Sequence, residues 1–329
     1  MYLDFKKINL ACVCLLGSLC LFAQQEPIYS MYGLNGFLFN PAVAGSDGYT
    51  TVGMSARDYM LGFENSPKTY VLSLQGRLLR SNYKIKSSLL SKDKSLSKRS
   101  GRVGLGAYLF NDRNGLIQRT GGSFTYAYHI FMQNTQLSFG LAVSTFQFKL
   151  DQGKLAFSNN QGPEPLKNQD LSNELLIPDV SFGTYLLTPN SFLGLSITNL
   201  FQRRIPLGTT TYDYRMFRTY FLMGGKRFNN EDLFSYEPSF LLKGTEKMIF
   251  QADLQMRFFY HHDYYLGLSY RTGSAIGLLI GAKVNRIQIG YAFDYGLTSI
   301  QRYTYGAHEI NIALKLGDNA RRYRWLIRY

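Results

Sequence analysis

The stretch HEINIALKL, residues 308–316, places Glu309, Asn311 and Lys315 on one face of a strand and isoleucine and leucine on the other. The stretch IQIGYAFD, residues 287–294, repeats the pattern. Successive side chains of a β-strand point to opposite faces, so each stretch has one apolar and one polar face. Such a strand divides two environments, and lipid can be the environment on the apolar side.

Fourteen segments of the chain show patterns of this kind between turn signals. Most have about the 9–11 residues that a tilted strand needs to cross a bilayer, and an even strand number is typical of closed bacterial barrels. We therefore predict an all-β fold, a transmembrane antiparallel outer-membrane β-barrel of about 14 strands. The predicted strands are 49–58, 68–79, 102–111, 117–131, 135–149, 177–188, 191–200, 215–228, 233–243, 248–259, 263–272, 275–284, 286–295 and 307–317.

The composition of the two faces supports a barrel over a soluble sheet. Glycine and serine are frequent on the polar faces, as at Gly104 and Gly106, and small side chains suit a crowded lumen. Aromatic residues such as Phe258, Phe259 and Tyr264 gather near strand ends, like the girdles of membrane barrels. These features predict that the apolar faces meet outer-membrane lipid.

One predicted strand, 135–149, changes its pattern after Ser144. Phe146 and Phe148 are apolar but stand at positions where the alternation predicts polar residues. We expect either a β-bulge, which would shift the alternation by one residue, or an extension of the strand beyond the membrane.

The N-terminus indicates export. Lys6 and Lys7 precede the apolar stretch 8–21, and cleavage after Ala23 defines a signal peptide over 1–23. All three cysteines lie inside this segment, so the mature chain would form no disulfide. No stretch reaches the roughly 18 consecutive apolar residues of a membrane helix. With 45% hydrophobic and 15% aromatic residues, the exported chain is either a soluble secreted β protein or an outer-membrane barrel.

Signatures of enzymes and metal sites are absent from the sequence, and we predict neither an enzyme nor a cofactor. There is no G-x-S-x-G or H-E-x-x-H motif. His261, His262 and Asp263 are adjacent, but neighbouring strand side chains point apart, which indicates a polar turn rather than a metal site. Asp253 and Arg257 share the predicted lumen face, and we expect hydrogen-bonded ladders there.

Several short motifs occur in an order that covers nearly the whole mature chain. Their residues include Asn40, Pro41, Ala44, Gly45, Pro67, Lys68, Asn111, Asp112, Gly115, His308 and Glu309. In this order they resemble the PorP/SprF family of type IX secretion proteins of Bacteroidetes. The resemblance implies an outer-membrane barrel that supports export or surface attachment of a secreted client, in gliding bacteria a large adhesin. The chain departs from the family in one place, because a Lys/Ser-rich insert, 80–101, replaces a short turn.

The motif around Asn40 lies in the segment 24–48, which precedes the first predicted strand. Proline removes a hydrogen-bond donor and Gly45 allows a positive φ, so the motif indicates a turn. It either turns the chain at the barrel entrance, or the whole segment enters the lumen as a plug. The aromatic side chains of Tyr29, Tyr32, Phe37 and Phe39 favour the plug, because a barrel of fourteen strands needs filling or leaves a channel.

Positive charge is concentrated in two segments of a chain with net charge +14. These are the insert, with Lys84, Lys86, Lys92, Lys94, Lys98 and Arg99, and the tail 318–329, with Arg321, Arg322 and Arg324. If the N-terminus is periplasmic, both lie at the periplasmic rim of the barrel over 49–317. Two interpretations of these basic segments remain. They are solvated and attracted to anionic lipid, or they bind an acidic periplasmic component of the secretion or motility machinery. Despite this charge, we expect no nucleic-acid partner for a chain that is exported.

The same orientation puts the long connections 150–176, 201–214 and 296–306 outside the cell. Arg203, Arg204 and Tyr212 are candidate client contacts, since arginine and tyrosine often anchor interfaces. The sequence thus predicts a partner-binding barrel of a secretion system. The alternative is a porin-like passive channel or transporter, and a barrel enzyme is a remote third.

Overall fold

The computed structural model describes residues 29–317 apart from 64, 79–101, 116, 151–174, 203, 207–212, 231–232, 248 and 262. The signal peptide, the residues 24–28, the basic insert and the basic tail therefore lie outside the described residues, and their predictions stay predictions. Among the described residues, no helix is both long and apolar enough to span a membrane.

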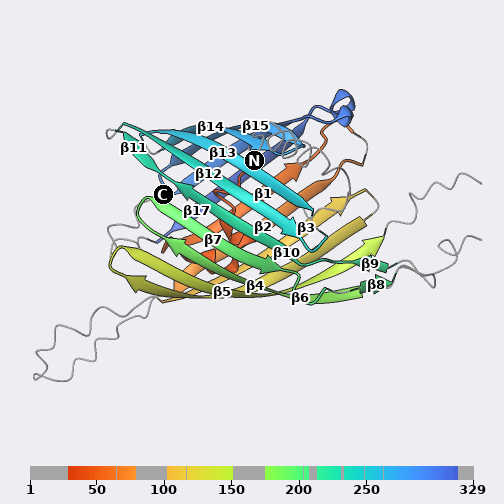
Figure 1. Ribbon diagram of the computed structural model, residues 1–329, viewed down its shortest axis with the longest axis horizontal. Coiled ribbons are helices and arrows are strands. Elements are labelled where there is room, and N and C mark those ends of the chain that lie inside the picture. The colour runs from red at the N-terminus through yellow and green to blue at the C-terminus, as the bar shows by residue number, and fades with distance from the viewer. Residues whose placement is uncertain are drawn as a thin grey trace, which may run out of the picture.

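The described chain forms a closed barrel of fourteen antiparallel strands (Figure 1). Each strand pairs with its neighbours in sequence, and the ring closes where the first strand pairs with the last. Each of the fourteen predicted segments overlaps one of these strands. The strands are β1 (Thr50–Asp58), β2 (Lys68–Leu78), β3 (Val103–Asn114), β4 (Ile117–Met132), β5 (Thr135–Leu150), β6 (Leu175–Leu187), β7 (Ser191–Thr198), β10 (Thr219–Lys226), β12 (Phe234–Thr245), β13 (Phe250–Tyr260), β14 (Tyr264–Arg271), β15 (Ala275–Val284), β16 (Ile287–Gly296) and β17 (Ala307–Leu316).

The predicted strand 215–228 is divided in the structure. Its barrel part is β10, and β11 (Phe228–Asn230) follows after Arg227 in the same register against β12. Before it, β8 (Arg204–Pro206) and β9 (Asp213–Arg215) pair with each other in a separate hairpin. Figure 1 shows this hairpin at the right end of the barrel. The alternation continues across these breaks, which is why the sequence indicated one strand.

The expected bulge in 135–149 is absent. β4 and β5 pair residue for residue from Ile117↔Leu150 to Met132↔Thr135. Phe146 and Phe148 stay on the inner face, where they are buried against Ile177 and Met216. The pattern changes because the lumen is apolar at this end of the strand, and the backbone keeps its register. At 16 residues, β5 is also longer than a membrane-spanning strand requires, in agreement with the other expectation, an extension.

Burial is reversed relative to a water-soluble protein. Along β13, Leu254 and Phe258 are 50% and 51% exposed, whereas Asp253 and Arg257 are each 3% exposed. Tyr260 and Tyr264 are also exposed near the strand ends, as an aromatic girdle requires, but Phe259 faces the lumen. The outer surface is therefore apolar and suited to lipid, and the charged side chains are enclosed.

The two ends of the barrel differ, and we name them by their connections. The long-loop rim carries the connections 59–67, 151–174 and 297–306, the last of which includes the short helix η4 (Ser299–Tyr303). The tail rim carries the connection 79–102 and the turns 133–134 and 285–286, and β17 also ends there. That the tail rim faces the periplasm stays a prediction.

Residues 29–48 lie inside the barrel, and we call them the plug. They contain the helical turns α2 (Gly36–Phe39) and η1 (Pro41–Val43), and η1 contacts β4, β5 and β6. Tyr29, Tyr32, Phe37 and Phe39 are all buried, as the plug hypothesis predicted. In Figure 1 this red segment occupies the space within the ring of strands. The main core cluster joins its aromatic residues to the inner faces of the wall.

Candidate functional site

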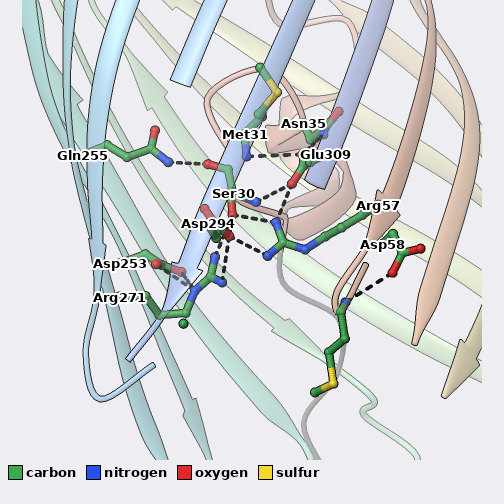
Figure 2. Close-up of polar contacts among 12 residues, drawn as sticks. Ser30, Met31, Asn35, Arg57, Asp58, Asp253, Gln255, Arg271, Asp294 and Glu309 are labelled. Atoms are coloured by element: carbon green, nitrogen blue, oxygen red, sulfur yellow. Dashed lines mark hydrogen bonds and ion pairs between the residues drawn. The ribbon is translucent and has the colours of Figure 1, made fainter. Parts of the chain in front are cut away.

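The plug is anchored near the long-loop rim by a buried ionic cluster. Arg57 of β1 lies at its centre, with Nη2 2.6 Å from Asp294 of β16 and Nη1 2.7 Å from Glu309 of β17. Arg57 Nη1 also donates to Ser30 Oγ at 2.5 Å. We call the group the Ser30 cluster, and its members are Ser30, Arg57, Asp253, Arg271, Asp294 and Glu309 (Figure 2).

The cluster holds the plug backbone as well as its side chain. Ser30 N donates to Glu309 Oε2 at 2.6 Å and Met31 N to Glu309 Oε1 at 3.3 Å. The side-chain amide of Gln255 donates a hydrogen bond to Ser30 O, and the Ser30 hydroxyl donates one to Asp294. Arg271 of β14 also donates to Ser30 Oγ at 3.1 Å, so five strands contribute to the binding of one residue and fix this end of the plug.

The charges of the Ser30 cluster nearly balance. Arg271 of β14 completes it, with Nε 2.9 Å from Asp253 and Nη1 3.4 Å from Asp294. Two guanidinium groups therefore face three carboxylates, and the side chains of Arg57 and Glu309 are 2% and 0% exposed. Buried ion pairs recover their desolvation penalty only in good geometry, so they add more specificity than net stability. Removal of one partner leaves a buried charge and is strongly destabilising.

The middle of the plug is fixed by Asn40. Its Oδ1 accepts a hydrogen bond from Ala42 N at 2.9 Å, which caps η1. Its Nδ2 donates to Thr184 O of β6 at 2.8 Å, and Ser196 Oγ of β7 donates to Phe39 O at 2.7 Å. Asparagine can do this because its amide has both an acceptor and donors, so one side chain shapes the turn and attaches it to the wall.

The end of the plug nearest the tail rim is held through its backbone carbonyl groups. His129 Nε2 donates to Ala44 O at 3.1 Å, and Arg77 donates to Gly45 O at 3.0 Å and to Ser46 O at 2.7 Å. Gly45 has φ +67°, a conformation that favours glycine. The plug is thus attached at both ends and in the middle.

The plug also contacts the wall through the buried hydroxyl group of Tyr32. Desolvation raises the pKa of the Tyr32 hydroxyl, which therefore stays protonated. It forms a hydrogen bond of 3.1 Å with Ser239 Oγ of β12. The contact adds a neutral link between the plug and the wall beside the ionic ones.

Comparison with protein families gives a match to the type IX secretion system membrane protein PorP/SprF over residues 21–314. The chain belongs to this family. It is an outer-membrane β-barrel of the type IX secretion system class, and the resemblance seen in its motifs is confirmed. No curated protein sequence matches the chain.

Solved structures similar to this PorP/SprF protein are outer-membrane barrels. The Ralstonia pickettii toluene transporter TbuX has a TM-score of 0.45 at 10% identity, over 86% of this chain and 93% of that one. The Acinetobacter baumannii outer membrane protein Omp33 has a TM-score of 0.44 at 7% identity, over 82% and 100%. The TodX monoaromatic hydrocarbon channel has a TM-score of 0.42 at 11% identity, over 85% and 92%. The family and these neighbours are described as secretion components, transporters and channels rather than as enzymes.

The family-motif residues of this PorP/SprF protein fall into two groups. The plug and its anchors contain Asn40, Pro41, Ala44, Gly45 and Glu309. The remaining residues lie in the wall near the long-loop rim or in its connections there: Pro67, Lys68, Asn111, Asp112, Gly115 and His308. Of these, Asp112 pairs with Arg119 and accepts from Thr69, Lys68 pairs with Asp58, and His308 bonds the Tyr291 hydroxyl. These contacts lie within the wall, and the sequence did not distinguish the two groups.

The predicted partner contacts are mostly outside the described residues. These are Lys84, Lys86, Lys92, Lys94, Lys98, Arg99, Arg203, Tyr212, Arg321, Arg322 and Arg324. Arg204 belongs to β8, beyond the barrel wall. Asp253 and Arg257, expected in lumen ladders, bind different partners, Arg271 and Glu237.

The sequence analysis missed the central residues of the anchor, Ser30 and Arg57. The sequence did contain a signal for Arg57. It is a charged residue at a polar position in the alternation of a predicted strand, and such residues face the lumen. Ser30 has no comparable signal, since its role depends on where the plug ends.

Exchange of Asn40 for aspartate tests the middle attachment. The variant Asn40→Asp keeps the acceptor for Ala42 N but presents a carboxylate oxygen to the carbonyls of Thr184 and Leu195. We expect the free energy of unfolding to fall by about 1–3 kcal/mol, because a buried donor is lost and carbonyl groups are left unpaired. Urea titration in vesicles, read by the gel mobility of the folded barrel, measures this. Asn111→Asp is the control, since within the described residues the side chain of Asn111 hydrogen-bonds to the exposed Thr120 hydroxyl alone. Equal stability of both variants would contradict the assignment.

Proposed function

We propose that this protein serves the type IX secretion system as a closed, partner-binding barrel that supports the export or surface attachment of a secreted client. The observation that carries the proposal is the plug, which is attached at three levels of the lumen by the Ser30 cluster, Asn40 and Arg77. A passive channel needs a continuous aqueous path, and twenty residues packed across the lumen oppose one. The binding functions would then lie at the two rims.

The long-loop rim is the proposed surface for the secreted client. It carries the long connections and the β8–β9 hairpin, which extends beyond the barrel wall. The tail rim is the proposed surface for components of the secretion or motility machinery. Support comes from the sequence, since the basic segments 80–101 and 318–329 are attached to strand ends at that rim, after Leu78 and after Leu316. An adhesin client and a role in gliding belong to the same proposal.

Conductance across a planar bilayer tests the closed barrel against the porin-like channel. We expect no steady conductance from the full chain and a large, steady conductance after deletion of residues 29–48, because an emptied barrel of this size leaves an aqueous path. The control is a deletion of residues 207–210 outside the barrel strands, which should leave the full chain's closed behaviour unchanged. A large conductance from the intact protein would overturn the closed-barrel proposal.

A further inference from the structure

A row of polar side chains lines the inner wall just inside the tail rim. It consists of Tyr265 of β14, Lys283 of β15, Gln288 of β16 and Lys315 of β17. Lys283 and Gln288 are direct cross-strand partners, and Tyr265 is paired with Gly281, two residues before Lys283. The four residues therefore follow one another around a quarter of the barrel mouth, and we call them the mouth row.

The mouth row faces two adjoining cavities beneath the plug. A cavity of about 30 Å³ is lined by Tyr265, Lys283, Gln288 and the plug residue Leu34. A second, of about 70 Å³, shares Leu34 and Gln288 with the first. Each is large enough for ordered water or for one small group of a ligand, since a single water needs roughly 10–15 Å³.

Two donors of the mouth row have no partner within the described part of the chain. Lys283 makes no side-chain hydrogen bond or ion pair there, and the buried Tyr265 hydroxyl has no hydrogen-bond partner. The neighbouring cationic side chains, in contrast, have acidic partners. Arg227 and Arg257 both bind Glu237, and Lys315 lies 3.5 Å from Asp47. The penalty for a buried donor without a partner applies to the Tyr265 hydroxyl, whereas Lys283 is only partly buried, and a ligand that brings an acceptor can bind both.

The chemistry of the cavities suits an anionic group joined to apolar ones. Lys283 offers a charge and Tyr265 a hydroxyl donor, which together match a carboxylate. Asp263 also lines the first cavity, but Arg227, Arg257 and Lys283 line it too, so cationic side chains outnumber carboxylates around it. The second cavity adds apolar walls from Phe37, Phe192 and Met223. A lipid headgroup is a poor occupant, since the mouth row lies on the lumen face and lipid meets the opposite face of the same strands.

We propose that the mouth row receives an acidic polypeptide segment of a partner that approaches the tail rim, with one carboxylate bound between Lys283 and Tyr265. The inference rests on the proposed function only in that a secretion-system component would supply this segment. It adds the place of contact, the lumen mouth, and the chemical class of the contacting segment, acidic with apolar neighbours. The basic segments at the same rim would raise the rate at which such a partner arrives.

Fluorescence anisotropy with purified full-length protein in detergent tests the proposal. The probe is a short fluorescein-labelled peptide of alternating glutamate and leucine, with a lysine and leucine peptide of equal length for comparison. We expect the acidic peptide to bind the wild type, to bind Lys283→Glu at least about tenfold more weakly, and to bind Tyr265→Phe with intermediate affinity. Higher salt should weaken binding, because the contact is between charges.

The matched control is Lys247→Glu, which makes the same charge change on an exposed lysine at the long-loop rim. Equal affinity of Lys283→Glu and the wild type, no binding of the acidic peptide, or equal binding of the lysine and leucine peptide would each overturn the proposal. Preferential binding to anionic phospholipid vesicles, lost in Lys283→Glu, would assign the row to lipid and also overturn it. The outcome is independent of the conductance test, so a conducting barrel would refute the closed-barrel function without affecting peptide binding.

Discussion

Replacement of Arg57 by alanine is expected to lower the free energy of unfolding by about 3–5 kcal/mol, the usual effect of removing one partner of a buried ion pair. Arg57 contacts Asp294, Glu309 and Ser30, and its side chain is only 2% exposed. Without it, two buried carboxylates face each other across β16 and β17 with Arg271 as the remaining cation. The plug loses its fixed end, so we also expect steady conductance in a planar bilayer.

The control for Arg57→Ala is Lys68→Ala. Lys68 also pairs with a carboxylate of β1, Asp58, at 3.0 Å, but its side chain is 44% exposed. Exposed pairs contribute about 0–1 kcal/mol, so this variant should keep its stability and stay closed. A third variant, Arg57→Met with Asp294→Asn and Glu309→Gln, removes the unpaired charges and should recover part of the lost stability. If Arg57→Ala unfolds at the same urea concentration as Lys68→Ala, the Ser30 cluster is not the anchor.

A leucine at position 140 is expected to displace the plug while the barrel stays folded. Gly140 of β5 lies directly under η1, and a Cβ there would be 2.6 Å from Ala42 Cα and nearer still to backbone atoms of Pro41 and Ala42. Backbone cannot move aside as a flexible side chain can. Overpacking of this kind costs about 1–3 kcal/mol or more, which the system can avoid by moving the plug out of the lumen.

Two measurements follow the displacement in Gly140→Leu. Steady conductance reports an opened lumen. Labelling by a maleimide reports exposure of a cysteine introduced by Ala44→Cys, at a position that is 0% exposed in the plugged barrel. Gly244→Leu is the matched control, because a Cβ at Gly244 meets no atom within 4 Å. A closed, unlabelled Gly140→Leu variant would show that the plug tolerates the added side chain, contrary to the packing argument.

The wall of this barrel could be predicted from the sequence because its signal is local. Alternation over ten residues shows which side chain of β13 or β17 meets lipid, and the turns separate one strand from the next. The same local reading failed at Phe146 and Phe148, since an apolar side chain facing an apolar part of the lumen looks like a slip of register. It was also inexact at 215–228, where β9 ends at Arg215 and the barrel strand β10 begins only at Thr219.

The site could be predicted only in outline. The aromatic residues and Asn40 indicated a plug, because composition and turn chemistry are local properties. The contacts that fix it join Ser30 to Asp294 and Glu309, more than 260 residues away in sequence. Such contacts depend on the strand register around the whole ring and on the depth at which the plug ends. Neither quantity is encoded in any single segment, so the Ser30 cluster became visible only in three dimensions.

The seam between β1 and β17 has a consequence for assembly. Arg57 and Glu309 are directly opposite each other in the register of these strands, and both bind Ser30. The last strand of the barrel therefore completes the pocket for the segment that precedes its first strand. Closure of the ring and seating of the plug stabilise each other, so a barrel that closes while empty leaves its own seam incomplete. Loss of the plug is therefore expected to weaken the seam between β1 and β17 as well.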